Sequence, residues 1–177
     1  MKLTDKDKVA GVEQIPDGKY SLEIVEPISY QEKEGTATDN LMVGMEVRGG
    51  DQDGRKKFIF CDLSGDFGKI RLAKIVGFSG LDKMLEKKYP KIDNSLGPVD
   101  WGRKYINTES KNGRALINDI QVMLPGYFID VTWETSTGRD GKEYQNPVEF
   151  DYCEKEITKP ESKGERKAEP ETEDEDW

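Results

Sequence analysis

Alternating apolar and polar residues predict five β-strands, three before and two after a helical middle section. In the first strand, Tyr20, Leu22 and Ile24 alternate with polar neighbours, which is the period of a half-buried strand. The same period of two returns at residues 41–47, 56–63, 127–135 and 148–152. The first three strands follow one another closely, which predicts an antiparallel meander.

Turn residues separate these strands. Pro16 fixes φ and Gly18 accepts a positive φ in the turn that precedes the first strand. Residues 31–40 are polar and predict a loop between the first two strands. Glycine-rich stretches at 49–54 and 137–141 predict hairpin connections.

The middle section changes to a helical period. Apolar residues within 70–76 fit a short helix with Asp66 as a candidate cap, and those within 81–85 fit a second helix between Ser79 and Pro90. Residues 91–118 show no clear period. We interpret them as a hairpin-like excursion with a turn at Lys111-Asn-Gly113.

This order of elements predicts a mainly β fold, a five-stranded OB-fold Greek-key barrel with a helical insert between strands 3 and 4. A small α+β sheet is the alternative. The barrel is expected within residues 15–153. A flexible arm at 1–14 precedes it, and a disordered acidic tail at 154–177 follows it.

Charge is concentrated at the end of the chain. The 177 residues carry a formal charge of −9, from 27 basic and 36 acidic side chains. The last nine residues hold six carboxylates and no cation, which leaves 30 acidic against 27 basic residues in the rest. The acidity of the whole chain therefore does not exclude a cationic binding face, and the distribution of Lys and Arg decides where such a face lies.

The residue types present argue against several classes of chemistry. The chain has no histidine, and Cys61 and Cys153 stand far apart without a CxxC pair. We therefore expect no metal site, no cofactor and two buried, reduced thiols. No Walker loop or nucleophile–base pair occurs, which predicts a binding protein without catalytic activity. No apolar run reaches ~18 residues and no signal-peptide pattern is visible, so a cytoplasmic protein without a membrane span is expected.

The hairpin around residues 49–54 is the best candidate for a binding surface. Single strands require point charges for their phosphates and flat aromatic surfaces for their bases. If Ile59 and Cys61 face the core, the aromatic residues between them lie on the opposite face. Both parities of this strand are apolar, and the alternative interpretation, which we slightly favour, places the two Phe rings in the core. The candidate DNA-binding residues here are Arg48, Arg55, Lys56, Lys57, Phe58 and Phe60.

The second hairpin repeats this combination of residue types. Trp133 precedes its loop, Arg139 and Lys142 lie within it, and Tyr144 follows it. In an OB-fold, the loop between strands 4 and 5 flanks the nucleic-acid groove. These four residues are therefore also candidate DNA-binding residues. The alternatives are a solvated turn for the two cations and a core position for the Trp.

The acidic end of the chain is a candidate partner-binding tail. Blocks of like charge commonly serve as interaction arms, and a terminal Trp supplies an apolar anchor for a pocket on a partner. A purely solubilising tail is the alternative. The tail residues concerned are Glu169, Glu171, Glu173, Asp174, Glu175, Asp176 and Trp177.

With these features, the chain resembles the bacteriophage single-stranded DNA-binding proteins. The resemblance rests on the turn Pro16-Asp-Gly-Lys-Tyr20, on Gly54-Arg-Lys-Lys-Phe58, and on the acidic tail that ends in an aromatic residue. It implies sequence-independent coating of single-stranded DNA during phage replication or recombination, in the host cytoplasm. It also implies a tail that occupies the groove when DNA is absent and recruits replication or recombination proteins when DNA displaces it.

Two other functions stay open at this point. One is an acidic adaptor or inhibitor that binds a basic host protein and does not contact DNA. The other is an enzyme whose site the sequence does not reveal. The sequence also leaves open the oligomeric state, self-association included, and the preference for DNA over RNA.

Overall fold

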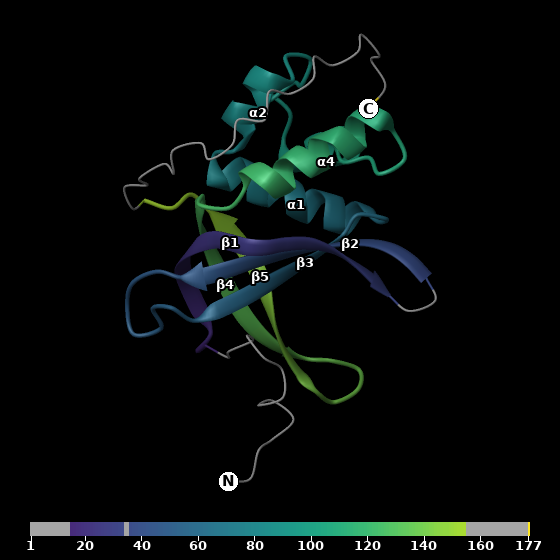
Figure 1. The fold of residues 1–177 in the computed structure, drawn as a ribbon. Coiled ribbons are helices and arrows are strands. Elements are labelled where there is room, and N and C mark those ends of the chain that lie inside the picture. The colour runs from purple at the N-terminus through teal and green to yellow at the C-terminus, as the bar shows by residue number, and fades with distance from the viewer. Residues whose placement is uncertain (1–14, 34–35, 155–176) are drawn as a thin grey trace.

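The computed structural model describes residues 15–33, 36–154 and 177. Within them, five antiparallel strands form one open sheet in the order β3-β2-β1-β4-β5, and the helices gather on one side of this sheet (Figure 1). The strands are β1 (Gly18–Lys33), β2 (Thr36–Val47), β3 (Lys56–Asp62), β4 (Phe128–Thr137) and β5 (Glu143–Asp151). Between β3 and β4 lie α1 (Asp66–Ser79), α2 (Asp82–Lys88), α3 (Pro98–Tyr105) and α4 (Lys111–Met123).

The central strand β1 sets the register of the sheet. Leu22 pairs with Val47 of β2 on one side and with Ile129 of β4 on the other. All three side chains are buried, so this row lies on the inner face, which packs with the apolar side chains of the helices into one core. The neighbouring row, which includes Glu23 and Glu46, lies on the outer face.

The mainly β fold and the helical insert between the third and fourth strands are confirmed, whereas a closed OB-fold barrel is not. Within the described residues, the edge strands β3 and β5 form no ladder with each other. Long side chains bridge the two edges here. Lys57 Nζ of β3 donates a hydrogen bond of 2.7 Å to Gln145 Oε1 of β5, which shows that the sheet curls until its edges approach.

Hydrogen bonds join the turn before β1 to strands β4 and β5. The Tyr20 hydroxyl donates to the Pro16 carbonyl at 2.6 Å, which gives the Pro-x-Gly-x-Tyr sequence a local structural role. The Asp17 carboxylate accepts hydrogen bonds from the Thr135 amide and hydroxyl and from Gln145 Nε2. These bonds lower the pKa of Asp17, with those from Thr135 as the main cause.

Two expectations about local structure are wrong. Residues 31–40 do not form a polar loop, because β1 continues to Lys33 and β2 begins at Thr36. Residues 91–118 do not form a hairpin-like excursion, because they contain α3 and the first half of α4. The polar character of these segments obscured their regular backbone structure.

Residues of turn-like composition in 91–118 begin helices instead, among them the predicted turn at Lys111-Asn-Gly113. Pro98 stands at the first position of α3, where no backbone donor is lost. At α4, the Ser110 hydroxyl caps the helix by accepting from the Gly113 amide at 3.0 Å. Gly113 is required there for space, since a Cβ at that position would lie 1.9 Å from the Asn107 carbonyl oxygen.

Candidate nucleic-acid interface

Strand β3 presents two aromatic side chains on the outer face of the sheet. Ile59 and Cys61 are buried, while Phe60 is 45% exposed and Phe58 is half-buried. The interpretation of Phe58 and Phe60 as core residues is therefore wrong. Burial raises the pKa of the Cys61 thiol to about 12, which keeps this buried cysteine in its unreactive form.

A second exposed aromatic group, which the sequence did not reveal, lies on α1 beside the edge strand β3. Phe67 is 74% exposed in the first turn of the helix. One turn later, the Arg71 guanidinium lies over its ring, 4.7 Å from the ring centre. The same guanidinium donates a hydrogen bond of 2.9 Å to the Phe60 carbonyl. Arg71 therefore connects the aromatic residues of β3 and α1.

Two of the predicted cations extend this surface toward the loop between β2 and β3. Arg55 and Lys56 are exposed at the start of β3, and Lys56 stands opposite Glu46 of β2 on the outer face. The loop is held by a hydrogen bond from the Gly49 amide to Asp53 Oδ1 at 2.6 Å. This hydrogen bond orders the loop that leads to Arg55 and Lys56 at the start of β3.

Arg48 is engaged by neighbouring carboxylates. Its guanidinium forms an ion pair with Glu46 at 2.8 Å and a second, hydrogen-bonded one with Glu23. The hydrogen bond to Glu46 is the main cause of its raised pKa. Binding a phosphate would require this arginine to exchange these partners, so Arg48 contributes less positive field than its sequence position suggested.

Lys57 and Trp133, both candidate DNA-binding residues, lie in the core, which for Trp133 was the alternative interpretation. Only 5% of Lys57 and 1% of Trp133 are exposed, and the ammonium group sits 4.5 Å from the centre of the indole ring. Burial lowers the pKa of Lys57. The physical reason is parity, since Lys57 shares the inner face with Ile59. Neither side chain is accessible to a nucleic acid in this structure.

The second hairpin places its predicted residues at the opposite edge of the sheet. Arg139, Lys142 and Tyr144 are exposed. The Tyr144 hydroxyl donates to the Asp140 carboxylate, and this bond is the main cause of the lowered pKa of Asp140. Because Gln145 reaches Lys57, the beginnings of β3 and β5 lie near each other across the curled sheet. The two basic hairpins can therefore border one surface.

Carboxylates occupy much of the outer face over β1, β4 and β5. Asp130 accepts a hydrogen bond from the Ser21 hydroxyl at 2.7 Å, and Asp151 forms an ion pair of 3.1 Å with Lys19. Glu134 and Glu149 are exposed nearby. This part of the sheet repels phosphates, which restricts a nucleic-acid path to the side of β2, β3 and the start of α1.

Trp177 lies against the helices, not on the strands. Its indole packs edge-to-face on Tyr89 and Tyr105, and Figure 1 marks this end of the chain beside α4. The other predicted tail residues, Glu169 to Asp176, lie outside the described residues. The sequence predicted that Trp177 anchors the tail in a pocket on a partner, which stays a prediction, and it gave no indication that a pocket for this residue exists in the same chain.

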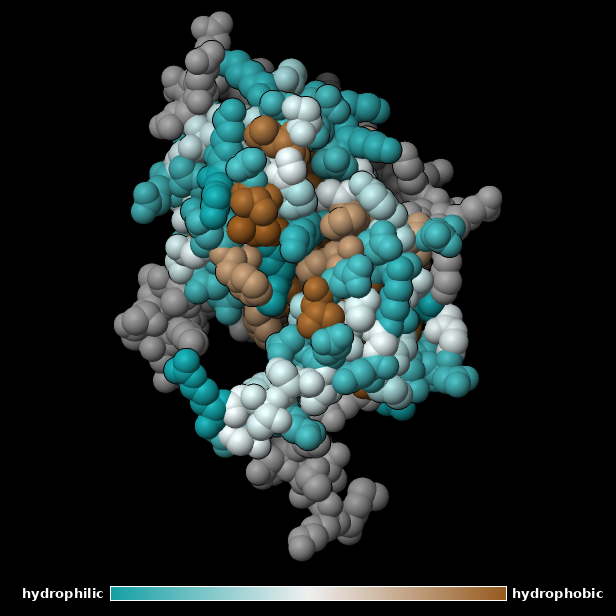
Figure 2. All heavy atoms as spheres, turned by 180° about the vertical axis from the view of Figure 1, so that it is seen from behind, coloured by the Kyte–Doolittle hydropathy of each residue, from teal (hydrophilic) through white to brown (hydrophobic). Residues whose placement is uncertain are grey.

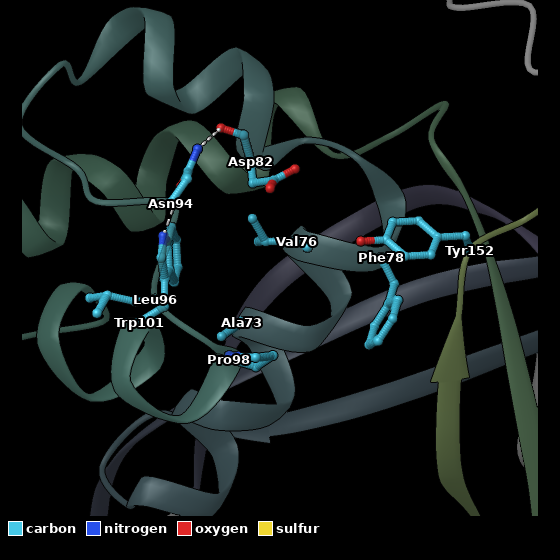
Figure 3. Close-up of a pocket in the computed structure, with 10 residues that line it drawn as sticks. Ala73, Val76, Phe78, Asp82, Asn94, Leu96, Pro98, Trp101 and Tyr152 are labelled. Carbon is cyan, nitrogen blue, oxygen red and sulfur yellow. Dashed lines mark hydrogen bonds between the residues drawn. The ribbon is translucent and has the colours of Figure 1, made fainter.

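A separate cavity opens among the helices. Seen from behind, apolar side chains gather around a hollow near the middle of the molecule (Figure 2). A cavity of about 220 Å³ lies between α1, the segment before α3 and Tyr152. The Asn94 side chain spans one wall, where it donates to the Asp82 carbonyl and accepts from the Trp101 indole (Figure 3). Burial raises the pKa of Asp82, but the described residues that line the cavity include no second acid, no cation and no nucleophile to pair with it.

Comparison with known proteins adds no family assignment, because no family model and no curated protein sequence matches this chain.

Among the described residues, no helix is long and apolar enough to cross a membrane, and no three His, Cys, Asp or Glu side chains cluster in a way that would hold a metal ion. Cys61 is buried and Cys153 half-buried, and neither forms a disulfide. The candidate interface therefore rests on the geometry of the aromatic and basic side chains.

Proposed function

We propose that this protein binds single-stranded DNA without sequence preference, along the outer face of β2 and β3 and the first turn of α1. The observation that carries the proposal is the pair of exposed aromatic side chains, Phe60 and Phe67, with Arg71 stacked on the second ring and hydrogen-bonded to the backbone of the first. Exposed apolar side chains that gather on one surface commonly mark an interaction site, which supports a binding role for these two rings. The resemblance to phage single-stranded DNA-binding proteins supports a role in phage DNA replication or recombination.

The chemistry of this surface suits an unpaired strand. Bases of any sequence offer a flat π-face, so Phe60 and Phe67 can stack on them without reading their edges. Arg55 and Lys56 supply charges for phosphates at the start of β3. In a duplex the bases are already stacked on one another, so the aromatic contacts favour single strands.

The order of the strands gives further support, although it shows less than a complete barrel. β1 lies between β2 and β4, as in an OB-fold, and the helical insert follows the third strand as it does there. We propose that the chain is a distorted member of this class of fold, in which the bridge from Lys57 to Gln145 replaces the missing ladder between β3 and β5. In OB-folds the face of strands 2 and 3 is the usual oligonucleotide site.

The test is a direct binding titration. Fluorescently labelled oligo-dT is titrated with the full chain, in parallel with a labelled duplex of equal length and with oligo-rU, at two salt concentrations. We expect preferential binding of the single strands, weaker at high salt. Equal binding of duplex and single strand, or no binding of either, would refute the proposal.

The acidic outer face over β1, β4 and β5 favours a second candidate function. Asp130, Glu134 and Glu149 lie on that face, and such a surface suits a basic protein partner better than a nucleic acid. In this candidate the protein is an acidic adaptor or inhibitor. Absence of oligonucleotide binding, together with capture of a basic partner that is lost when these three acids are neutralised, would establish this function in place of the first.

A further inference from the structure

Trp177 occupies a preformed aromatic site on the helical side of the molecule. Its ring centre lies 5.5 Å from that of Tyr89 and 5.2 Å from that of Tyr105, with interplanar angles of 63° and 82°. Edge-to-face pairs of this kind are favourable beyond the apolar area that they bury. Asn107 Nδ2 also donates a hydrogen bond of 2.9 Å to the main-chain oxygen of Trp177.

The walls of this site are fixed by contacts that do not involve Trp177. The Tyr89 hydroxyl donates to the Asp119 carboxylate of α4. The Tyr105 hydroxyl accepts from the Asp93 amide at 2.8 Å, and Trp101 packs edge-to-face behind its ring. Other elements hold both tyrosines in place. Binding of the indole therefore does not have to order these side chains, and it loses less conformational entropy.

Asn107 is held in the same way. Its side-chain Oδ1 accepts a hydrogen bond of 2.9 Å from the Glu109 amide, which leaves Nδ2 directed at the main chain of Trp177. The site therefore combines an apolar slot with one oriented donor. Such a site recognises an aromatic residue together with its backbone, not an apolar surface in general.

Basic side chains lie beside the aromatic slot. Lys104 Nζ is 5.3 Å from the centre of the Tyr105 ring, and Lys88 Nζ, which forms an ion pair of 2.6 Å with Asp119, is 5.8 Å from that of Tyr89. Lys87 is exposed on the same short helix as Lys88. In the sequence, six carboxylates stand within the eight residues that precede Trp177. An acidic segment that ends in an indole therefore complements both the charge and the shape of this site.

We propose that the slot formed by Tyr89, Tyr105 and Asn107 is an intramolecular docking site for Trp177, and that docking withholds this tryptophan from other proteins. A partner that uses the indole as an anchor must first compete with the protein's own slot. The proposal does not depend on DNA binding, since the slot belongs to α2, α3 and their neighbours and not to the β3 surface.

One substitution tests the slot without removing its walls. Asn107→Asp keeps the Oδ1 acceptor for the Glu109 amide but replaces the donor to Trp177 with a negative charge. Acrylamide quenching of Trp fluorescence reports the result, because Trp101 and Trp133 are buried and contribute little quenchable emission. The signal of Trp177 is the difference between each full chain and its Trp177→Ala counterpart.

We expect the Trp177 signal of the unchanged chain to be quenched several-fold less than that of a free peptide of residues 169–177. In Asn107→Asp it should approach the peptide. Equal quenching of Trp177 in the unchanged chain and the free peptide would overturn the proposal. So would protection that survives Asn107→Asp, since the slot would then not be what covers the indole. Circular dichroism and thermal unfolding confirm that each variant folds.

A second measurement distinguishes the chain's own tryptophan from that of a second copy. Intramolecular docking does not depend on protein concentration, whereas docking between copies weakens on dilution. We expect the same protection of Trp177 across the whole concentration range. Protection that is lost on dilution, with a parallel change in sedimentation, would overturn the intramolecular assignment and identify the slot as a contact between copies.

Discussion

The guanidinium of Arg71 covers the ring of Phe67 and at the same time donates to the carbonyl of Phe60, so one side chain joins helix α1 to the edge strand β3. Because β3 is an edge strand in the described sheet, one side of its backbone lacks a neighbouring strand there. Arg71 covers part of this edge and ties the exposed ring of Phe67 to the backbone of Phe60. This arrangement would limit the entropy lost when an unpaired strand binds.

Replacement of Phe60 or Phe67 by Ala is expected to weaken oligo-dT binding. Loss of one stacked base costs ~1–3 kcal/mol, which corresponds to about 5- to 150-fold in Kd. Phe60→Leu keeps most of the apolar area but loses the flat ring, so it should behave like Phe60→Ala if stacking is the interaction. Val148→Ala, at a strand residue that is 51% exposed on β5, is the control and should leave Kd unchanged. Equal effects of Phe60→Ala and Val148→Ala would place the binding surface elsewhere.

Replacement of Arg55 and Lys56 together by Ala should reduce the salt dependence of binding. If the protein contacts ~3–5 phosphates, log K falls against log salt with a slope of about −2 to −3.5, and loss of two contacts flattens it by roughly 1.4. The measurement is a series of oligo-dT titrations at increasing salt. Lys83→Ala with Lys111→Ala, two exposed cations of the helices, removes the same charge from the opposite side. A slope change of similar size in that control would show a general charge effect and no local contact.

Much of the sheet was predictable from the sequence because one of its faces is buried. Alternation marked β3 and β4 clearly, since Ile59 and Val131 belong to the core and their neighbours do not. Alternation could not decide the parity of β3, because both of its faces carry apolar side chains. The structure resolves this point through Lys57, which shares the inner face with Ile59 and is paired there with Gln145.

The helices α3 and α4 and the contribution of Phe67 to the candidate interface were harder to predict. Gly97-Pro98 and Asn112-Gly113 have the composition of turns, yet one pair begins α3 and the other lies in the first turn of α4. Local composition gives no sign of the close approach of the Asn107 carbonyl oxygen, which is what requires a glycine at position 113. The contribution of Phe67 was missed for a similar reason, because an aromatic residue near a helix start gives no sign of lying beside β3 until the chain is folded.

Two glycines of α1 should respond in opposite ways to substitution by Ala. A Cβ at Gly68 would lie 1.9 Å from the Asp62 carbonyl oxygen, whereas a Cβ at Gly77 meets nothing within 4 Å. Gly68→Ala should therefore lower the free energy of unfolding by at least ~1–3 kcal/mol, as overpacking does. Gly77→Ala should raise it by up to about 1 kcal/mol, since Ala is the better helix former. Urea denaturation measures both, and a stable Gly68→Ala variant would contradict the close packing of α1 on the end of β3.

The hydrogen bonds to Asp17 predict a specific loss of stability in acid. Thr135 and Gln145 stabilise the charged carboxylate, so its pKa in the folded protein lies below the ordinary value of 3.8. Its contribution is fully present above 3.8 and is lost as the pH falls through 3.8 toward the lower folded value, because protonation removes the acceptor that these donors need. Asp17→Asn should therefore be less stable than the unchanged chain at neutral pH, and the gap should narrow as the pH falls through that range. Urea unfolding at a series of pH values measures this gap, with Asp51→Asn in the β2–β3 loop as a control for the charge change. A gap that stays constant from neutral pH to below pH 3 would show that the carboxylate of Asp17 does not hold the start of β1 against β4 and β5.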